Sequence, residues 1–195
     1  MRRCLITMCF VILVVSAASV QGKKAVPPPS KPAGDGPSLK VTMKFIQDKL
    51  NGIGPVNYAV YAHDDITGIS GTGQNKAEVT KVVADPSACL FSYHARAQGT
   101  GLETQDRDPE FHLKNVEKIV VMPMDQALKE NAAAAGHPSR SFRIDPPVFN
   151  LDVRRTDTKG TNDFLFLDEE LANRVAKAMV HAVELCGGGS QPEPF

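Results

Sequence analysis

The first regular pattern in this chain is an apolar stripe at helical spacing that begins near residue 39. Met43, Ile46 and Leu50 recur at intervals that place all three on one helix face. Ser38 has a side chain that is preferred at an N-cap, and Asn51-Gly52 is a usual stop signal. The sequence therefore predicts a helix over 39–50 with one buried face.

A second, longer stripe lies near the carboxyl end of the chain. Asp168 is a suitable N-cap, and Glu169 and Glu170 place negative charge at the positive end of the helix dipole. Gly187 and the glycines after it end the pattern. The face expected to be buried carries apolar or small side chains at helical spacing: Leu171, Val175, Met179, Ala182 and Cys186.

Between these two helices the apolar period changes to two, which is typical of strands. Two stretches rich in glycine and polar residues, Asp64–Asn75 and Gln98–Pro109, are expected to be exposed loops. Met124–His137 stays open between helix and loop, because its alanine run favours a helix whereas its neighbours are strands. The expected strands cover residues 56–62, 77–84, 89–97, 111–113, 116–122, 148–155 and 164–167.

The alternation also assigns faces to two of these strands. In 89–97 the aromatic side chains Phe91 and Tyr93 share the inward face. In 148–155 the apolar residues Phe149, Leu151 and Val153 are predicted to point inward. The even-numbered residues Asn150, Asp152 and Arg154 are predicted to point outward. Each strand is therefore expected to bury one side only.

Together these elements predict an α+β fold. It consists of an antiparallel sheet, or partly open barrel, of about seven strands, with an amphipathic helix at its C-terminal end and an extra helix at its N-terminal end. A single domain is expected over 39–187, followed by a disordered tail over 188–195. This order of elements resembles the pleckstrin-homology-like superfold, in which a C-terminal helix closes one end of a bent sheet.

Three segments also resemble a group of small exported bacterial proteins. They are TMKFIQDKL at 42–50, the Cys-x-x-x-Tyr strand at 89–93, and DEELANRVAKAMVHAVELCGG at 168–188. The likeness covers most of the chain after its N-terminal segment. It brings no activity and no functional residue to this chain.

The first residues have the layout of a secretory signal peptide. Arg2 and Arg3 precede the apolar run Leu5–Val15, and small residues follow it. This run is shorter than the ~20 residues that a membrane-spanning helix needs. We therefore expect a signal peptide over 1–22 and a Pro-rich linker over 23–38. The protein is expected to be exported to the periplasm or the extracellular space, without stable membrane insertion after cleavage.

The charge balance narrows the choice of partners. The chain has 22 basic and 22 acidic side chains, and loss of Arg2 and Arg3 with the signal leaves 20 against 22, a net charge of −2. This balance excludes the basic surface that nucleic-acid binding needs. The pleckstrin-homology-like resemblance implies binding of phosphoinositide headgroups, but the loops contain as many Asp as Lys. The cations available for that role are Lys76, Lys81, Arg154, Arg155 and Lys159.

Two cysteines, Cys89 and Cys186, remain after the predicted signal peptide. In an oxidising compartment, two thiols that the fold brings together tend to form a disulfide. If the closing helix packs on the sheet, a Cys89–Cys186 bond would join the two. The alternative is two buried, unpaired thiols.

Candidate metal ligands are present but dispersed. In His63-Asp64-Asp65, neighbouring strand residues point to opposite faces, so these side chains are not expected to converge. Asp64, Asp65, Asp106 and Asp108 offer carboxylates for Ca²⁺ without the EF-hand spacing. The other histidines form no His-x-His or His-x-x-x-His pair: His94, His112, His137 and His181.

Catalytic and phosphate-binding motifs are incomplete as well. Gly68-Ile69-Ser70-Gly71 resembles a nucleophile elbow, but Thr72 stands at the place of the second glycine. Gly71-Thr72-Gly73-Gln74 precedes a predicted strand, whereas a phosphate loop opens a helix. The sequence therefore assigns no catalytic, cofactor-binding or metal residue.

The leading functional hypothesis is a non-catalytic binding or adaptor domain of the bacterial cell envelope. It would recognise an envelope protein or peptide through an exposed sheet edge or a loop. Two alternatives stay open. One is an envelope enzyme with a polar site in the loops 64–75 and 98–109, and the other is a carrier of a small ligand in a barrel cavity.

Overall fold

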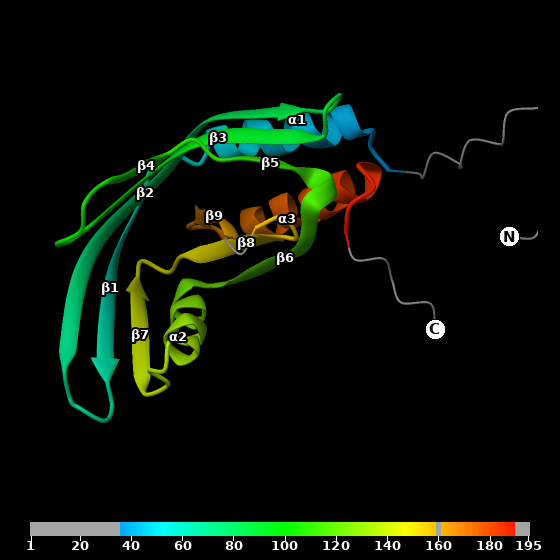
Figure 1. The fold of residues 1–195 in the computed structure, drawn as a ribbon. Helices are drawn as coiled ribbons and strands as arrows, with labels where there is room; N and C mark the ends of the chain where they lie inside the picture. The colour runs from blue at the N-terminus through cyan, green and yellow to red at the C-terminus, as the bar shows by residue number, and fades with distance from the viewer. Residues whose placement is uncertain (1–35, 159–160, 190–195) are drawn as a thin grey trace, which may run out of the picture. The chain divides into compact units, whose positions relative to one another are not determined.

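The computed structural model describes residues 36–158 and 161–189 (Figure 1). The predicted signal peptide and most of the predicted linker lie outside the described residues. The chain divides after Gly36, and from Pro37 onward it forms one unit. Of the helices in the described ranges, none is long and apolar enough to cross a bilayer.

Helices and strands follow one another from Leu39 to Leu185. In chain order they are α1 (Leu39–Asn51), β1 (Val56–Asp64), β2 (Ser70–Asp85), β3 (Leu90–Gly99), β4 (Gln105–Arg107), β5 (Glu110–His112), the 3₁₀ turn η1 (Leu113–Asn115), β6 (Val116–Pro123), α2 (Met124–Ala134), β7 (Arg140–Asp145), β8 (Phe149–Arg155), β9 (Thr161–Phe166) and α3 (Glu169–Leu185).

The strands form two antiparallel sheets. The first sheet has the order β4-β3-β2-β1-β7, with β5 also paired to β3, and the second has the order β6-β8-β9. The predicted α+β fold, with an antiparallel sheet and a helix at each end, is therefore confirmed. Within the described residues the two sheets do not join into a closed barrel.

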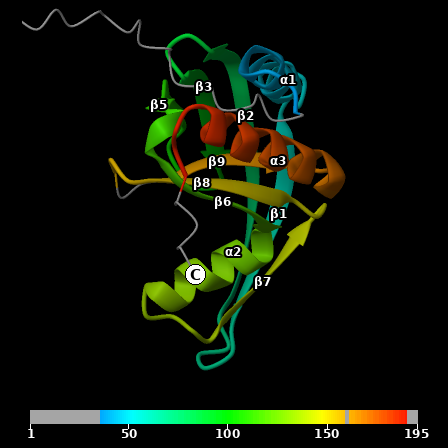
Figure 2. The same cartoon turned by 90° about the vertical axis from the view of Figure 1, so that its right-hand side faces the viewer.

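The core lies between the two sheets and the helices α1 and α3. These helices contact each other, and α3 also contacts all three strands of the second sheet (Figure 2). The predicted inward faces of α1, α3 and β3 are confirmed as the faces that meet the core, with Leu171 and Cys186 of α3 only partly buried. The largest fully buried side chains come from every layer: Met43, Ile46, Leu50, Phe91, Leu113, Leu151, Phe164, Phe166 and Met179.

The N-caps of α1 and α3 differ, and the difference gives a matched test. The Asp168 carboxylate accepts hydrogen bonds from the backbone N–H groups of Glu170 and Leu171 at 2.9 and 3.2 Å. Ser38 is the N-cap residue of α1, as predicted, but its side chain makes no capping bond to the described residues. We expect Asp168→Ala to lower the free energy of unfolding by about 1 kcal/mol. Ser38→Ala should leave it unchanged. Urea denaturation of both variants measures this, and equal losses would contradict the assignment.

A long β-ribbon replaces part of the first predicted loop. Within Asp64–Asn75, β1 continues to Asp64 and β2 begins at Ser70, which pairs with His63. The ribbon extends away from α1 and α3 (Figure 1), and the side chains near its tip are exposed on both faces. No apolar alternation therefore marks these residues as strand. In the second predicted loop, Gln98–Pro109, β3 runs on to Gly99 and the short strand β4 pairs with it.

The region after β6 contains two elements that the sequence did not decide. Met124–His137 begins with the helix α2, which settles the open choice, and β7 follows without having been predicted. These two elements lie side by side (Figures 1 and 2). Because α2 also contacts β6 and β8, it covers part of the outer face of the second sheet. Asn150 and Asp152, predicted to point outward, are therefore only 7% and 6% exposed.

The end of α3 packs on the turn η1. Gly188 N–H donates to the carbonyl of Val183, and Gly189 N–H donates to the carbonyl of Val116. A Cβ atom at Gly188 would lie 2.5 Å from the carbonyl oxygen of Leu113, so only glycine fits this contact. The first two residues of the predicted tail are thus part of the folded unit, and the rest lies outside the described residues.

Candidate functional site

The predicted disulfide between Cys89 and Cys186 is confirmed. Cys186 is the C-cap residue of α3, and Cys89 directly precedes β3. The two sulfur atoms are 2.01 Å apart and the two Cα atoms 5.9 Å apart. The bond therefore joins the closing helix to the first sheet.

The tip of the β1–β2 ribbon brings together three polar residues, two of which belong to the predicted loop. Ser70 Oγ lies 2.8 Å from His63 Nδ1, and Asp65 Oδ1 lies 3.6 Å from His63 Nε2. His63 and Asp65 approach each other, contrary to the prediction, because β1 ends at Asp64 and the turn redirects Asp65. Their side chains are 48% and 67% exposed, and 3.6 Å exceeds a hydrogen-bond length. The trio therefore lacks the oriented base that activates a nucleophilic serine.

The loop carboxylates bind protein groups instead of gathering around an ion. Hydrogen bonds, chiefly from the backbone N–H of Thr67, hold the pKa of Asp64 below its ordinary value. His94 lies between Asp106 and Asp108, with nitrogen–oxygen distances of 3.1 and 2.9 Å. Within residues 36–158 and 161–189, no group of three His, Cys, Asp or Glu side chains is arranged so that it could hold a metal ion.

The histidines outside these clusters also lie in positions that do not indicate a catalytic or metal site. His112 Nδ1 lies 3.3 Å from the carbonyl oxygen of Ala88, and His181 Nε2 lies 2.9 Å from that of Pro37. The backbone N–H of His137 donates to the carbonyl of Ala132 just after α2. The glycine-rich segment 71–74 lies inside β2, so it does not precede a helix.

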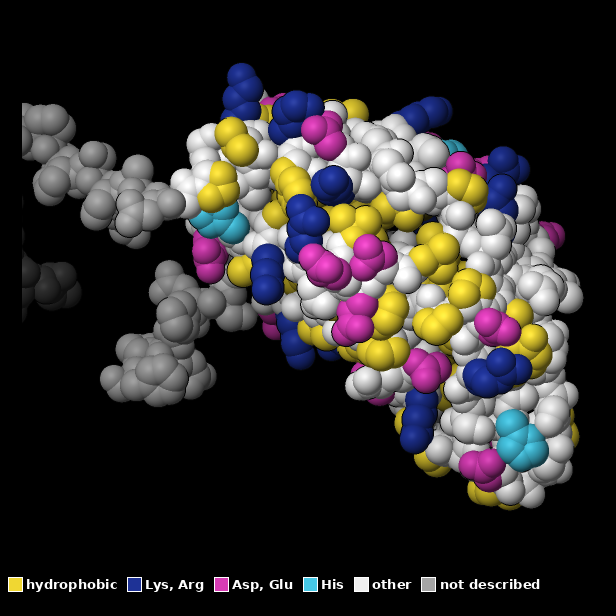
Figure 3. Space-filling model, turned by 180° about the vertical axis from the view of Figure 1, so that it is seen from behind, with side chains coloured by type: hydrophobic (Ala, Val, Ile, Leu, Met, Phe, Trp, Pro, Cys, Tyr) yellow, Lys and Arg dark blue, Asp and Glu magenta, His cyan; other side chains and the backbone are white. Residues whose placement is uncertain are grey.

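Among the described residues, the side chains considered for anion binding do not form a basic cluster. The two arginines are bonded to carboxylates, and the lysines lie elsewhere. Arg154 Nε donates to Asp152 at 2.8 Å, and this hydrogen bond raises the pKa of Arg154. Arg155 Nε donates to Asp157 at 2.7 Å and thereby lowers the pKa of that carboxyl. Lys and Arg are interspersed with Asp and Glu on the face shown in Figure 3. Of the three lysines considered for this role, Lys76 and Lys81 lie along β2, and Lys159 lies outside the described residues.

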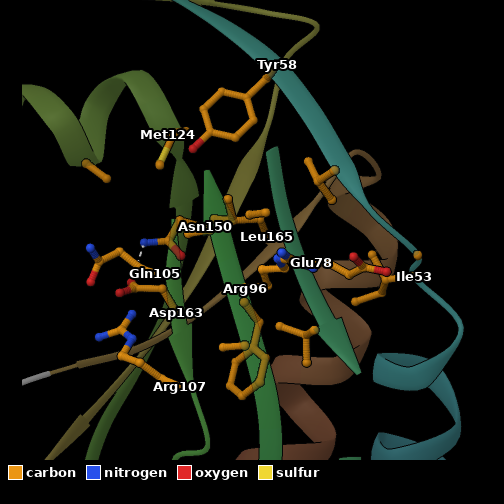
Figure 4. Close-up of a pocket in the computed structure, with 18 of the residues that line it drawn as sticks. Ile53, Tyr58, Glu78, Arg96, Gln105, Arg107, Met124, Asn150, Asp163 and Leu165 are labelled. Carbon is orange, nitrogen blue, oxygen red and sulfur yellow. Dashed lines mark hydrogen bonds between the residues drawn. The ribbon is translucent and has the colours of Figure 1, made fainter. Parts of the chain in front are cut away.

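A groove lies between the first sheet and the elements α2, β8 and β9 (Figure 4). The strand register places Ala77 opposite Ala97, and Val79 opposite Ala95. These small side chains continue the inward face that Phe91 and its neighbours fill in the core. Because small side chains leave unfilled volume between packed layers, a hollow of about 220 Å³ forms at this point.

On the opposite side of this hollow, polar side chains of the second sheet form the lining. Asn150 Nδ2 donates to Asp163 Oδ1 at 2.8 Å (Figure 4). The hydroxyl end of Tyr58 is turned toward Met124 at another side of the space. Burial raises the pKa of Tyr58, so this hydroxyl stays protonated near neutral pH and can donate a hydrogen bond. Arg107 on β4 completes the polar lining.

Two further hollows share lining residues with this one. One of about 500 Å³ lies beneath α2, and one of about 230 Å³ lies beside Tyr93 and Arg107. Asp163 lines all three hollows. We refer to the three together as the β9 groove, because β9 carries Asp163 and borders each of them.

Strand β9 borders the groove with an open edge. Across the part of the chain that the structure describes, β9 pairs with β8 and with no other strand. Its side chains alternate between a buried face with Asn162, Phe164 and Phe166 and an outer face with Thr161, Asp163 and Leu165. The backbone donors and acceptors along the open edge are therefore available for pairing.

The sequence prediction missed the groove, although two signals for it were present. Asn150 and Asp152 are polar residues at alternate positions of a strand that is otherwise apolar. Alanine stands at alternate positions 95 and 97 of β3 and at 77 of β2, where larger side chains would fill a core. Neither signal locates a site until the register places Ala77, Ala95 and Ala97 side by side.

Comparison of the chain with family models, curated proteins and solved structures gives no match. The pleckstrin-homology-like resemblance and the likeness to small exported bacterial proteins therefore stay predictions. The geometry of the β9 groove is the observation on which a function rests.

Proposed function

We propose that this protein is a non-catalytic binding domain that holds an extended peptide in the β9 groove. The open edge of β9 carries the proposal, because an unpaired strand edge binds an extended peptide through main-chain hydrogen bonds. Strands β3 and β4 form the other side of the groove, opposite this edge. A bound peptide would become the fourth strand of the second sheet.

The lining of the groove suits the side chains of such a peptide. Ala77, Ala95 and Ala97 provide a shallow apolar floor for small or branched side chains. The Asn150–Asp163 pair and the Tyr58 hydroxyl provide fixed polar groups at its sides. Apolar surface with a few placed polar groups is the usual composition of a binding site.

The two alternative functions have weaker support from the same residues. The Ser70–His63–Asp65 trio is exposed, and its carboxylate lies beyond hydrogen-bond distance. A small-ligand carrier would need a hollow of ~300–1,000 Å³ with a mostly apolar lining. The apolar hollow measures about 220 Å³, and the hollow of about 500 Å³ is lined mainly by charged and polar side chains. An elongated groove along a strand edge favours a peptide over both alternatives.

Export to the periplasm or the extracellular space is part of the proposal. Disulfides form and persist in oxidising compartments, and the Cys89–Cys186 bond supports that location. The basic, apolar and small segments at the amino end of the chain support it independently. The natural ligand would then be a segment of an envelope or extracellular protein.

The proposal is tested with a pool of hexapeptides that have Val or Thr at alternate positions. The pool is incubated with the protein, and retained peptides are identified by mass spectrometry. The tightest binder is then N-methylated at one residue at a time, and each dissociation constant is measured by calorimetry. Alternate residues of a strand direct their N–H groups to the same neighbour. We therefore expect about tenfold weaker binding at every second position only.

The variant Ala95→Phe tests the floor of the groove, because its larger ring fills the hollow that Ala95 shares with Thr161–Asp163. We expect it to abolish binding, and its melting temperature shows whether the variant keeps its fold. Retention of no peptide from the pool, or equal losses at all methylated positions, would contradict the proposal.

A further inference from the structure

The hollow beneath α2 has an acidic lining. It lies between the helix and the outer face of the second sheet and measures about 500 Å³. Among the described residues, carboxylates outnumber guanidinium groups around it by two. The carboxylates are Glu117, Glu130, Asp152 and Asp163, and the guanidinium groups are Arg154 and Arg155. This excess of negative charge favours a cationic occupant.

Two buried oxygen atoms in this lining lack a hydrogen-bond donor. Asn150 Oδ1 and Asp152 Oδ1 are fully covered and have no partner within the described ranges. The other polar atom of each side chain is engaged, since Asn150 Nδ2 donates to Asp163 and Asp152 Oδ2 accepts from Arg154. Buried polar atoms in native proteins are nearly always paired. These two acceptors can therefore bond to a donor that enters the hollow.

The two guanidinium groups do not provide that donor. Arg154 Nε is bonded to the second oxygen of Asp152 and leaves Oδ1 without a partner. The Arg155 guanidinium lies over the Phe111 ring at 5.7 Å, and its Nε donates to Asp157. Both arginines thus have contacts of their own, and the two acceptors stay unpaired.

The donor required is an organic cation and not a metal ion. Asn150 and Asp152 are two residues apart on one face of β8, which separates their side chains by about 7 Å along the strand. No three carboxylate, histidine or cysteine groups converge closely enough to hold a metal anywhere in the described parts of the chain. An ammonium or guanidinium group carries several N–H donors and can bond to acceptors that are spread in this way.

We infer that the hollow beneath α2 receives a Lys or Arg side chain of the peptide bound in the β9 groove. This inference rests on the proposed function and specifies its ligand. A strand added beside β9 lies about 10 Å from β8, because neighbouring strands are ~4.8 Å apart. Its outward side chains stand next to Thr161 and Asp163, which also line the hollow. The long stem of a Lys or Arg side chain spans the remaining distance to Asp152.

The test compares three peptides that share the sequence of the tightest groove binder. They carry Lys, norleucine or Glu at one outward position, and each dissociation constant is measured by calorimetry. We expect the Lys peptide to bind at least about tenfold more tightly than the norleucine peptide. The Glu peptide should bind more weakly than both.

Variants of the hollow show where the charge is recognised. Asp152→Asn and Glu130→Gln should each reduce the preference for Lys to less than about threefold and leave the norleucine peptide unaffected. Glu130 lies on the exposed side of α2, so Glu130→Gln keeps the test valid if Asp152→Asn does not fold. Glu184→Gln on α3 is the matched control and should keep the full preference.

The possible results separate the two proposals. If the Lys and norleucine peptides bind equally to the natural protein, the inferred cation site is wrong while peptide binding stands. If the preference for Lys survives in both hollow variants, the cation is recognised elsewhere and the inference is equally wrong. If no peptide in the series binds, the proposed function itself fails.

Discussion

Replacing both disulfide cysteines, as Cys89→Ala/Cys186→Ala, is expected to lower the free energy of unfolding by about 2–5 kcal/mol. The bond closes a loop of 97 residues, and long loops are at the upper end of this range because the cross-link removes more conformations from the unfolded chain. The bond also fastens the end of α3 to the first sheet. Guanidinium denaturation of the oxidised protein and of the variant measures the difference.

The single variants provide the control for the disulfide. Cys89→Ala and Cys186→Ala each remove the same bond, so each should lose nearly as much stability as the double variant. If the loss of stability in the double variant equals the sum of the two single losses, the two residues act separately. Equal stability of the reduced and oxidised natural protein would contradict the stabilising role of the bond.

Phe164→Ala is expected to lower the free energy of unfolding by about 3–5 kcal/mol. The Phe164 side chain is 0% exposed, and its ring centroid lies 4.9 Å from that of Tyr93. Tyr93 also donates a hydrogen bond of 3.0 Å from its hydroxyl to Asn162 Oδ1. Removal of the Phe164 ring therefore leaves a cavity in the part of the core where the two sheets meet.

The neighbouring residue supplies a matched comparison on the same strand. Leu165 is half-buried and faces the β9 groove, so Leu165→Ala should lose less than about 1 kcal/mol. The same variant should weaken peptide binding. Urea denaturation and calorimetry separate the two effects. Similar stability losses at the two positions would contradict the division of β9 into a core face and a groove face.

Elements with one buried face were predictable from the sequence. α1 and α3 have an apolar stripe with polar residues opposite, and β3 alternates cleanly through Phe91 and Tyr93. In each case one face meets the core and the other meets water, so the pattern has a single reading. The disulfide was predictable for a similar reason, since Cys186 lies on the apolar side of α3.

The missed elements lack this contrast between faces. The tip of the β1–β2 ribbon is exposed on both sides, so the polar and glycine-rich residues at 64–75 are indistinguishable from a loop. Ser38 has a capping side chain, yet only the backbone carbonyl of Ser38 is used, as the acceptor for the N–H of Thr42. N-cap propensity predicts which residue stands at the cap, but it does not predict which of its atoms form the capping hydrogen bond.

The groove could not be predicted from single strands, because it depends on what packs across from each one. Asn150 and Asp152 are polar and would face water in an isolated three-stranded sheet. They become buried because α2, whose existence the sequence left open, crosses this face. The floor of the groove likewise depends on the register in which β2 pairs with β3. Such features follow from tertiary contacts and not from local pattern.

Hydrogen exchange of the backbone amides, with and without the tightest hexapeptide, tests the central claim most directly. Pairing of the peptide with the open edge of β9 predicts slower exchange at alternate amides of Thr161–Phe166 and unchanged exchange at the ribbon tip around Ser70. Protection confined to the α1–α3 face, or none at all in β9 at saturating peptide, would contradict it.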